Sequence, residues 1–193
     1  MALETVTKPA IEPLTIRQVE DHLRVDDCSR EYLAALIQVA REHAEMFTSR
    51  QFIEATYRLH LDEFPGAVDA IELPRPPLIA VESIKYVDTD GVEQTLDASK
   101  YKVDAVSEPG RVVPAYGESW PVARSQINAV TVEYKAGYGA TRADVPQRAK
   151  QAMLLMCGDW YEHRENVVTG TIQTELSNTA KALLWGLRVM EAV

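Results

Sequence analysis

The chain has 193 residues, 46% of them hydrophobic, and its 20 basic and 29 acidic side chains give a formal net charge of −9. This composition is typical of a globular protein that buries a core without disulfides or metal ions. It argues against tight binding of nucleic acid by a basic face. No apolar run approaches about 18 residues and no basic, apolar leader is present, so we expect neither a membrane span nor a secretory signal.

The N-terminal segment is expected to be an extended arm as far as Pro13, and two helices are predicted after it. Thr15 and Gln18 form a capping box, which predicts a short helix beginning at Thr15. A second helix is predicted from about Ser29 to Thr48, because apolar residues recur there at helical spacing. Its apolar stripe comprises Leu33, Leu36, Ile37, Ala40, Ala44 and Phe47.

The middle of the chain has the period-two pattern of β-strands. Apolar and polar side chains alternate between Ile53 and Leu61, which predicts a half-buried strand. The connections between the predicted strands are too short for helical crossovers, so we expect antiparallel pairing. The further predicted strands are Ile71–Leu73, Val81–Val87, Val92–Leu96, Tyr101–Asp104, Arg111–Val113 and Ala129–Tyr134.

Helices are predicted again in the last third of the chain. Asp144 is expected to be the N-cap of a helix with Pro146 in its first turn and its end near Glu165. A polar link then precedes a last helix. The last helix has apolar side chains on more than one face, which a solvent-facing helix would not tolerate. We therefore expect a partner to cover part of it.

These elements predict an α+β fold in which the N- and C-terminal helices form a helical bundle, interrupted by an antiparallel β insertion. The expected divisions are residues 1–50 for the arm and the first two helices and 51–140 for the β insertion. Residues 141–193 would complete the helical core and end in the partner-binding helix.

No motif in the sequence predicts an enzyme, a cofactor or a metal ion. Gly137–Arg142 joins a strand to a helix but lacks the third glycine of a nucleotide-binding loop. Asp88–Gly91 resembles the start of a calcium loop without the later ligands. The four histidines lack the spacing of a helical zinc pair. Cys28 and Cys157 are expected to be free thiols in a reducing cytoplasm.

A series of short segments carries a family resemblance when taken in chain order. The segments are Leu14–Ile16 with Val19, His22–Asp26, Leu73–Leu78, Val81–Asp88, Val130–Tyr134, Ala136–Gly139, Asp144–Pro146 and Trp160–Glu162. Together they resemble the head-tail connector (adaptor) proteins of long-tailed bacteriophages and prophages, from Leu14 to the last helix. The chain departs from the family pattern at Ser49, where a glycine is expected after the second helix.

The resemblance implies a structural protein of the virion, made in the cytoplasm of the bacterial host. Family members form a ring of about twelve copies below the portal protein and take part in head completion. The ring extends the channel for double-stranded DNA, without binding it specifically, and docks a head-closure (stopper) or tail-terminator protein. An acidic wall suits such a channel, because it repels the phosphates of the passing duplex.

Two sets of contact residues are predicted for this role. The last helix is expected to contact the portal through Leu183, Leu184, Trp185, Leu187 and Met190. Two helices that carry charges beside apolar stripes are expected to join neighbouring subunits, through Arg41, Glu45, Trp160 and Arg164.

Two other classes of function remain open. A monomeric sugar- or peptide-binding module would use the aromatic residues of the β insertion, which are Tyr57, Tyr86, Tyr101, Tyr116 and Trp120. A hydrolase would use Asp62, Glu63 or Glu118 with His60, which only their proximity in the sequence suggests.

Overall fold

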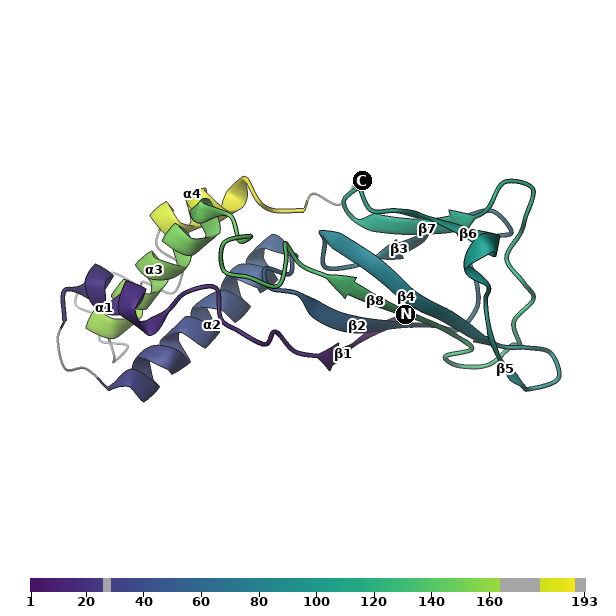
Figure 1. The fold of residues 1–193 in the computed structure, drawn as a ribbon, viewed down its shortest axis with the longest axis horizontal. Helices are drawn as coiled ribbons and strands as arrows, with labels where there is room; N and C mark the ends of the chain where they lie inside the picture. Colours follow the sequence, from purple (N-terminus) through teal and green to yellow (C-terminus); the bar gives the residue numbers. More distant parts are fainter. Residues whose placement is uncertain (26–28, 164–177, 190–193) are drawn as a thin grey trace. The chain divides into compact units, whose positions relative to one another are not determined.

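The chain folds into two compact units, each described here by itself (Figure 1). The computed structural model describes residues 1–25, 29–163 and 178–189. Residues 1–10 and 54–139 form the β unit, and residues 11–53 and 140–193 form the helical unit. The chain therefore passes between the units after residues 10, 53 and 139.

The helical unit contains α1 (Ile16–Leu23), α2 (Arg30–Thr48), α3 (Gln147–Glu162) and α4 (Asn178–Trp185). The predicted capping box is confirmed at α1, where the Thr15 hydroxyl accepts from the Gln18 amide and the Gln18 side chain accepts from the Thr15 amide. Ser29 caps α2 by a single side-chain bond, because its Oγ accepts from the amide of Tyr32 at 3.4 Å.

The core of the helical unit lies between α2 and α3, with α1 and α4 packed on α3. The predicted stripe of α2 is buried except for Phe47, which is half-buried. On α3 the buried apolar residues are Ala149, Ala152, Met153, Met156 and Cys157. Burial raises the pKa of the Cys157 thiol to about 12, so this cysteine is an inert core residue. Cys28 lies outside the described residues.

The predicted fold class is correct in its α+β composition and antiparallel pairing but wrong about the helical bundle. Among the described residues, α2 has 19 residues and α3 has 16, whereas α1 and α4 have eight each. Eight residues make about two turns and span about 12 Å. One long helix pair with two short helices against it is not a bundle of N- and C-terminal helices. An apolar stripe shows that a helix has a buried face, but it does not show how long the helices packed against that face are.

The start of α3 also differs from the prediction. Pro146 is the N-cap and makes no side-chain capping bond. The carboxylate of Asp144 instead accepts from the amide and the hydroxyl of Thr141, at 2.9 and 2.8 Å. Asp144 therefore closes a turn before the helix and does not cap the helix. Aspartate favours helix caps and turns alike, so its presence in the sequence did not distinguish them.

Ser49 ends α2 in the left-handed conformation, with φ 56° and ψ 29°. The amide of Ser49 binds the carbonyl of Met46 at 3.4 Å, and the amide of Arg50 binds the carbonyl of Glu45 at 3.2 Å. This is the Schellman arrangement, which glycine usually supplies. A serine thus adopts the turn geometry expected of a glycine, at a steric cost that comes from its Cβ.

Ser49→Gly is expected to raise the free energy of unfolding by about 1 kcal/mol, because glycine adopts this conformation without strain. The serine side chain is exposed, so its removal costs little burial. Chemical denaturation of both proteins measures the difference. Ser49→Ala keeps the Cβ and should give no such gain, so equal stability of the glycine and alanine variants would contradict the prediction.

The β unit is built from two antiparallel sheets. The five-stranded sheet has the order β1 (Ala2–Thr7), β2 (Ala55–Leu61), β8 (Val130–Ala136), β4 (Leu78–Val87), β5 (Glu93–Thr95). The three-stranded sheet has the order β3 (Ile71–Leu73), β7 (Gly110–Pro114), β6 (Tyr101–Asp104). All seven predicted strands are present as β2 to β8, and the expected extended arm contains the additional strand β1.

The two sheets share one hydrophobic core. Successive side chains of a strand point to opposite faces of the sheet, so β2 and β8 direct every second side chain into this core. These side chains include Tyr57, Leu59, Val132 and Tyr134. Gly110 lies so close to Leu78 that a Cβ there would be 2.6 Å from the leucine Cβ, which explains the glycine at this position. On the opposite face of the five-stranded sheet, here called the polar face, β2 and β8 carry Thr56, Arg58, His60, Thr131, Glu133 and Lys135.

Candidate interaction sites

Three of the residues proposed for a hydrolase have contacts with other groups. His60 Nε2 lies 3.2 Å from Glu4, the Asp62 carboxylate accepts from the amide of Asn128, and Glu118 pairs with Lys100 at 2.8 Å. Within the described residues, no group of three or more histidine, cysteine or acidic side chains is placed to hold a metal ion. In the same part of the chain, no helix is long and apolar enough to cross a bilayer.

The aromatic residues proposed for a ligand-binding module do not share an exposed face. Tyr57, Tyr101 and Trp120 belong to the core between the two sheets. The Trp120 ring stacks on Phe64, with 5.0 Å between centroids, and its indole nitrogen donates to the carbonyl of Asp69 at 2.8 Å. Tyr116 is fully exposed. One isolated exposed tyrosine does not make a stacking platform.

A cluster of three side chains, here called the Trp185 cluster, lies where α4 ends beside the end of α2. The Trp185 and Phe47 rings have centroids 6.4 Å apart, and the guanidinium carbon of Arg188 lies 5.5 and 5.9 Å from them. These distances are within the range of cation–π attraction. Trp185 is nevertheless 54% exposed, so a large aromatic surface faces solvent next to a cation.

The segment that carries the cluster is held firmly to α2. Leu184 is fully buried, the amide of Val189 donates to the carbonyl of Thr48 at 3.0 Å, and Arg50 Nε donates to the carbonyl of Leu187. The exposed indole of Trp185 is therefore presented by a fixed backbone, which reduces the entropy cost of using it in a contact.

The predicted portal-contacting residues differ in their exposure. Leu184 belongs to the core, Leu183 and Leu187 are half-buried, and Trp185 is exposed. Met190 lies outside the described residues. Sequence reasoning missed Phe47 and Arg188, because their contact with Trp185 joins segments far apart in the sequence.

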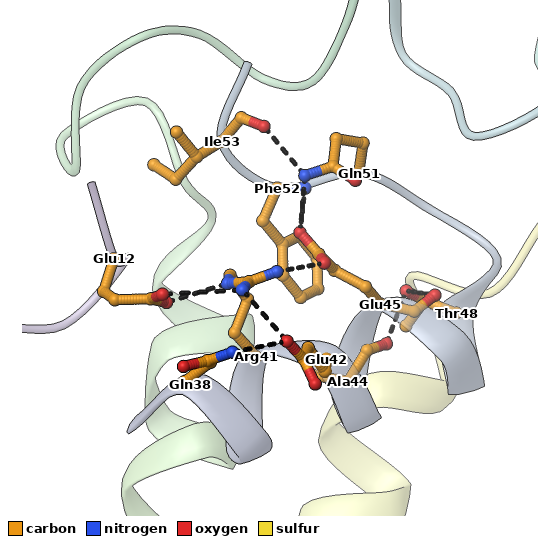
Figure 2. Close-up of polar contacts among 10 residues, drawn as sticks. All are labelled: Glu12, Gln38, Arg41, Glu42, Ala44, Glu45, Thr48, Gln51, Phe52 and Ile53. Atoms are coloured by element: carbon orange, nitrogen blue, oxygen red, sulfur yellow. Dashed lines mark hydrogen bonds and ion pairs between the residues drawn. The ribbon is translucent and has the colours of Figure 1, made fainter. Parts of the chain in front are cut away.

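Arg41 and Glu45 form a buried ion pair at the centre of a polar network (Figure 2). They are 8% and 5% exposed, and Arg41 Nη1 lies 2.8 Å from Glu45 Oε2. Arg41 Nε also donates to Glu12 at 2.7 Å. Burial lowers the pKa of the Arg41 guanidinium, but its bonds to Glu12 and Glu45 raise that pKa by more. The side chain is therefore charged.

The second oxygen of Glu45 binds the segment that follows α2. Glu45 Oε1 accepts from Gln51 Nε2 at 2.8 Å and from the amide of Phe52 at 3.0 Å, as Figure 2 shows. Glu12 lies two residues after the first passage between the units, and Phe52 lies two residues before the second. The network thus ties both connecting segments to α2.

The structure places the predicted subunit-contact residues in different environments. Arg41 and Glu45 face the interior of the helical unit. Trp160 is half-buried, with its ring edge-on to His43 at 6.1 Å, and its carbonyl accepts from the Tyr32 hydroxyl at 3.4 Å. Arg164 lies outside the described residues.

The fold of this chain is similar to that of chains in gene transfer agent (GTA) particles. A chain in the virion of the native GTA particle is 25% identical, with a TM-score of 0.79, and the alignment covers 100% of this chain and 98% of that chain. A chain in the neck of the empty GTA particle, computed with C6 symmetry, is 25% identical over the same shares, with a TM-score of 0.76.

A third chain, from the neck of the native GTA particle computed with C12 symmetry, has a TM-score of 0.73 at 24% identity and covers 100% of this chain and 98% of that chain. It shows a shared fold alone. No family model and no curated protein matches the chain. The chain thus has the fold of a structural component of phage-like particles.

Proposed function

We propose that this chain is a head-tail connector (adaptor) subunit in the neck of a phage-like particle, with a structural and not an enzymatic role. The observation that carries the proposal is the full-length similarity, at 25% identity and a TM-score of 0.76, to a chain in a GTA neck. The subunit would form a ring of about twelve copies below the portal. The ring would extend the DNA channel and dock the next head-completion or tail protein.

The symmetry of the similar neck supports a ring. A neck computed with C6 symmetry holds its off-axis subunits in multiples of six, and twelve copies satisfy this condition. A closed ring needs two different, complementary surfaces on each subunit. Trp160 and Arg164 remain our proposal for one of them, whereas Arg41 and Glu45 would act from inside the helical unit, by fixing α2, on which α3 packs.

The Trp185 cluster supports a contact with the portal in the proposed C-terminal part, residues 141–193. Tryptophan and arginine are the residue types most enriched in binding hot spots, and here they lie together on a fixed backbone. Leu183 and Leu187 would extend the contact, and Met190 belongs to the same proposed surface. Leu184 would contribute by holding α4 in place.

Charge supports the proposed channel. The formal net charge is −9, and several basic side chains are paired with carboxylates, which leaves them less free for phosphate. Such pairs join Arg58 to Glu133 and Lys135 to Glu82, at 2.8 and 3.1 Å. A wall of this kind disfavours contact with DNA within a Debye length of about 8 Å.

The mass of the purified full-length chain, measured alone and after mixing with the portal ring of the same particle, tests the proposal. We expect a complex in which about twelve copies join one portal ring. A chain that stays monomeric and passes through the mixture without binding the portal would contradict both the ring and its place in the neck.

A further inference from the structure

Strand β1 is attached to the β unit without contributing to its core. All six residues of Ala2–Thr7 are exposed, including the apolar Leu3 and Val6 at 38% and 41%. The strand lies at the edge of the five-stranded sheet, where β2 is its only hydrogen-bonded neighbour among the described residues. A strand that buries no side chain can leave the sheet without opening the core.

Backbone pairing and one carboxylate hold β1 in place. The register runs from Ala2 opposite His60 to Thr7 opposite Thr56, with an irregularity between Thr5 and Thr7. Glu4 contacts His60 at 3.2 Å and Arg58 at 3.6 Å. Such solvent-exposed polar contacts contribute little to stability. The same bonds form equally well when β1 and β2 belong to different copies of the chain.

The connection behind β1 has a fixed end. Glu12 is bound to the buried guanidinium of Arg41, so the chain is anchored there in the helical unit. Four residues, numbers 8 to 11, link this anchor to the strand, so Thr7 and Glu12 are five residue steps and at most about 18 Å apart. Pro9 stiffens the link, because its φ is fixed and the residue before it is restricted to extended conformations.

We infer that neighbouring subunits exchange this strand, so that β1 of one copy pairs with β2 of the next. The inference rests on the ring of the proposed function. Exchange replaces each contact by an identical one, and the ring holds the neighbouring β2 at high effective concentration. Because each copy contributes its β1 to the next copy, the exchanged strands join all subunits into a head-to-tail ring.

A disulfide between register partners tests which β2 receives the strand. Ala2 and His60 lie opposite each other on the polar face, at a spacing that a disulfide can bridge. The Ala2→Cys, His60→Cys double variant keeps the Glu4–Arg58 contact. The assembled ring is oxidised, denatured without reductant and separated by size. Native mass, measured before oxidation, shows whether the ring has formed.

Exchange predicts a ladder of covalent multimers reaching the whole ring. Disulfides confined to single chains would overturn exchange while leaving the ring intact. An oxidised ring in which neither bond forms would overturn it as well, because β1 would then pair with no β2. Failure of the wild-type chain to form a ring would instead contradict the proposed function, and exchange with it.

A mixture of single variants provides the control. Ala2→Cys protein mixed with His60→Cys protein can be linked only between copies, so exchange predicts a covalent dimer. In the matched mixture, Lys85→Cys replaces His60→Cys. Lys85 lies on β4, three strands from β1 and about 14 Å away within one sheet. A dimer of equal yield in the matched mixture would show random collision and overturn the assignment.

Discussion

Replacing Glu45 by alanine is expected to lower the free energy of unfolding by about 3 kcal/mol. The substitution removes one partner of a buried ion pair and leaves the Arg41 guanidinium, 8% exposed, with Glu12 as its close partner. It also leaves the amide of Phe52 and the side chain of Gln51 without the oxygen that accepts from both. The loss of these two hydrogen bonds adds to the cost.

Glu42→Ala is the matched control, because Glu42 lies on the same helix and also contacts Arg41. Its contact is longer, at 3.5 Å, and its side chain is 55% exposed, so a loss below about 0.5 kcal/mol is expected. Urea denaturation followed by circular dichroism measures both variants. Equal losses for the two glutamates would contradict a special role of the buried pair.

Local patterns predicted the elements of this fold well, since the signals for them lie within a few residues. The capping box at Thr15 and the stripe from Leu33 to Ala44 identified α1 and α2. The alternation from Ile53 to Leu61 identified β2. β1 gave only the weaker signal of an extended arm, because a strand that buries nothing need not alternate.

The arrangement of these elements depends on contacts that no local pattern contains. Arg41 and Glu45 are four residues apart, a spacing that predicts an ion pair on a helix whether the pair is buried or exposed. Their burial depends on Glu12 and Phe52, which the fold brings to α2. The helical bundle was predicted wrongly for the same reason: apolar spacing shows that a helix has a buried face, but not what covers it.

The last helix shows the same limit at the candidate site. Its apolar residues cover more than one face, and the sequence could not show which face is buried. In the structure Ala180 and Leu184 enter the core, whereas Trp185 points to solvent beside Phe47 and Arg188. A pattern of exposed aromatic and cationic residues forms only when α2 and α4 meet.

Trp185→Ala is expected to weaken binding to the portal ring by about 30-fold or more, the loss typical of a hot-spot tryptophan. The fold should be retained, because the indole is 54% exposed and its aromatic and cation–π contacts at an exposed site contribute about 1 kcal/mol. Titration of the portal ring with each variant, followed by sedimentation, measures the affinity.

Two alanine variants separate recognition from folding at this site. Tyr116→Ala removes a fully exposed aromatic residue of the β unit and should bind the portal as the wild type does. Leu184→Ala empties a buried position and should lower the free energy of unfolding by about 2 to 5 kcal/mol. Undiminished binding by a folded Trp185→Ala protein would contradict a portal contact through α4. A loss shared with Tyr116→Ala would show that the effect is not specific to the Trp185 cluster.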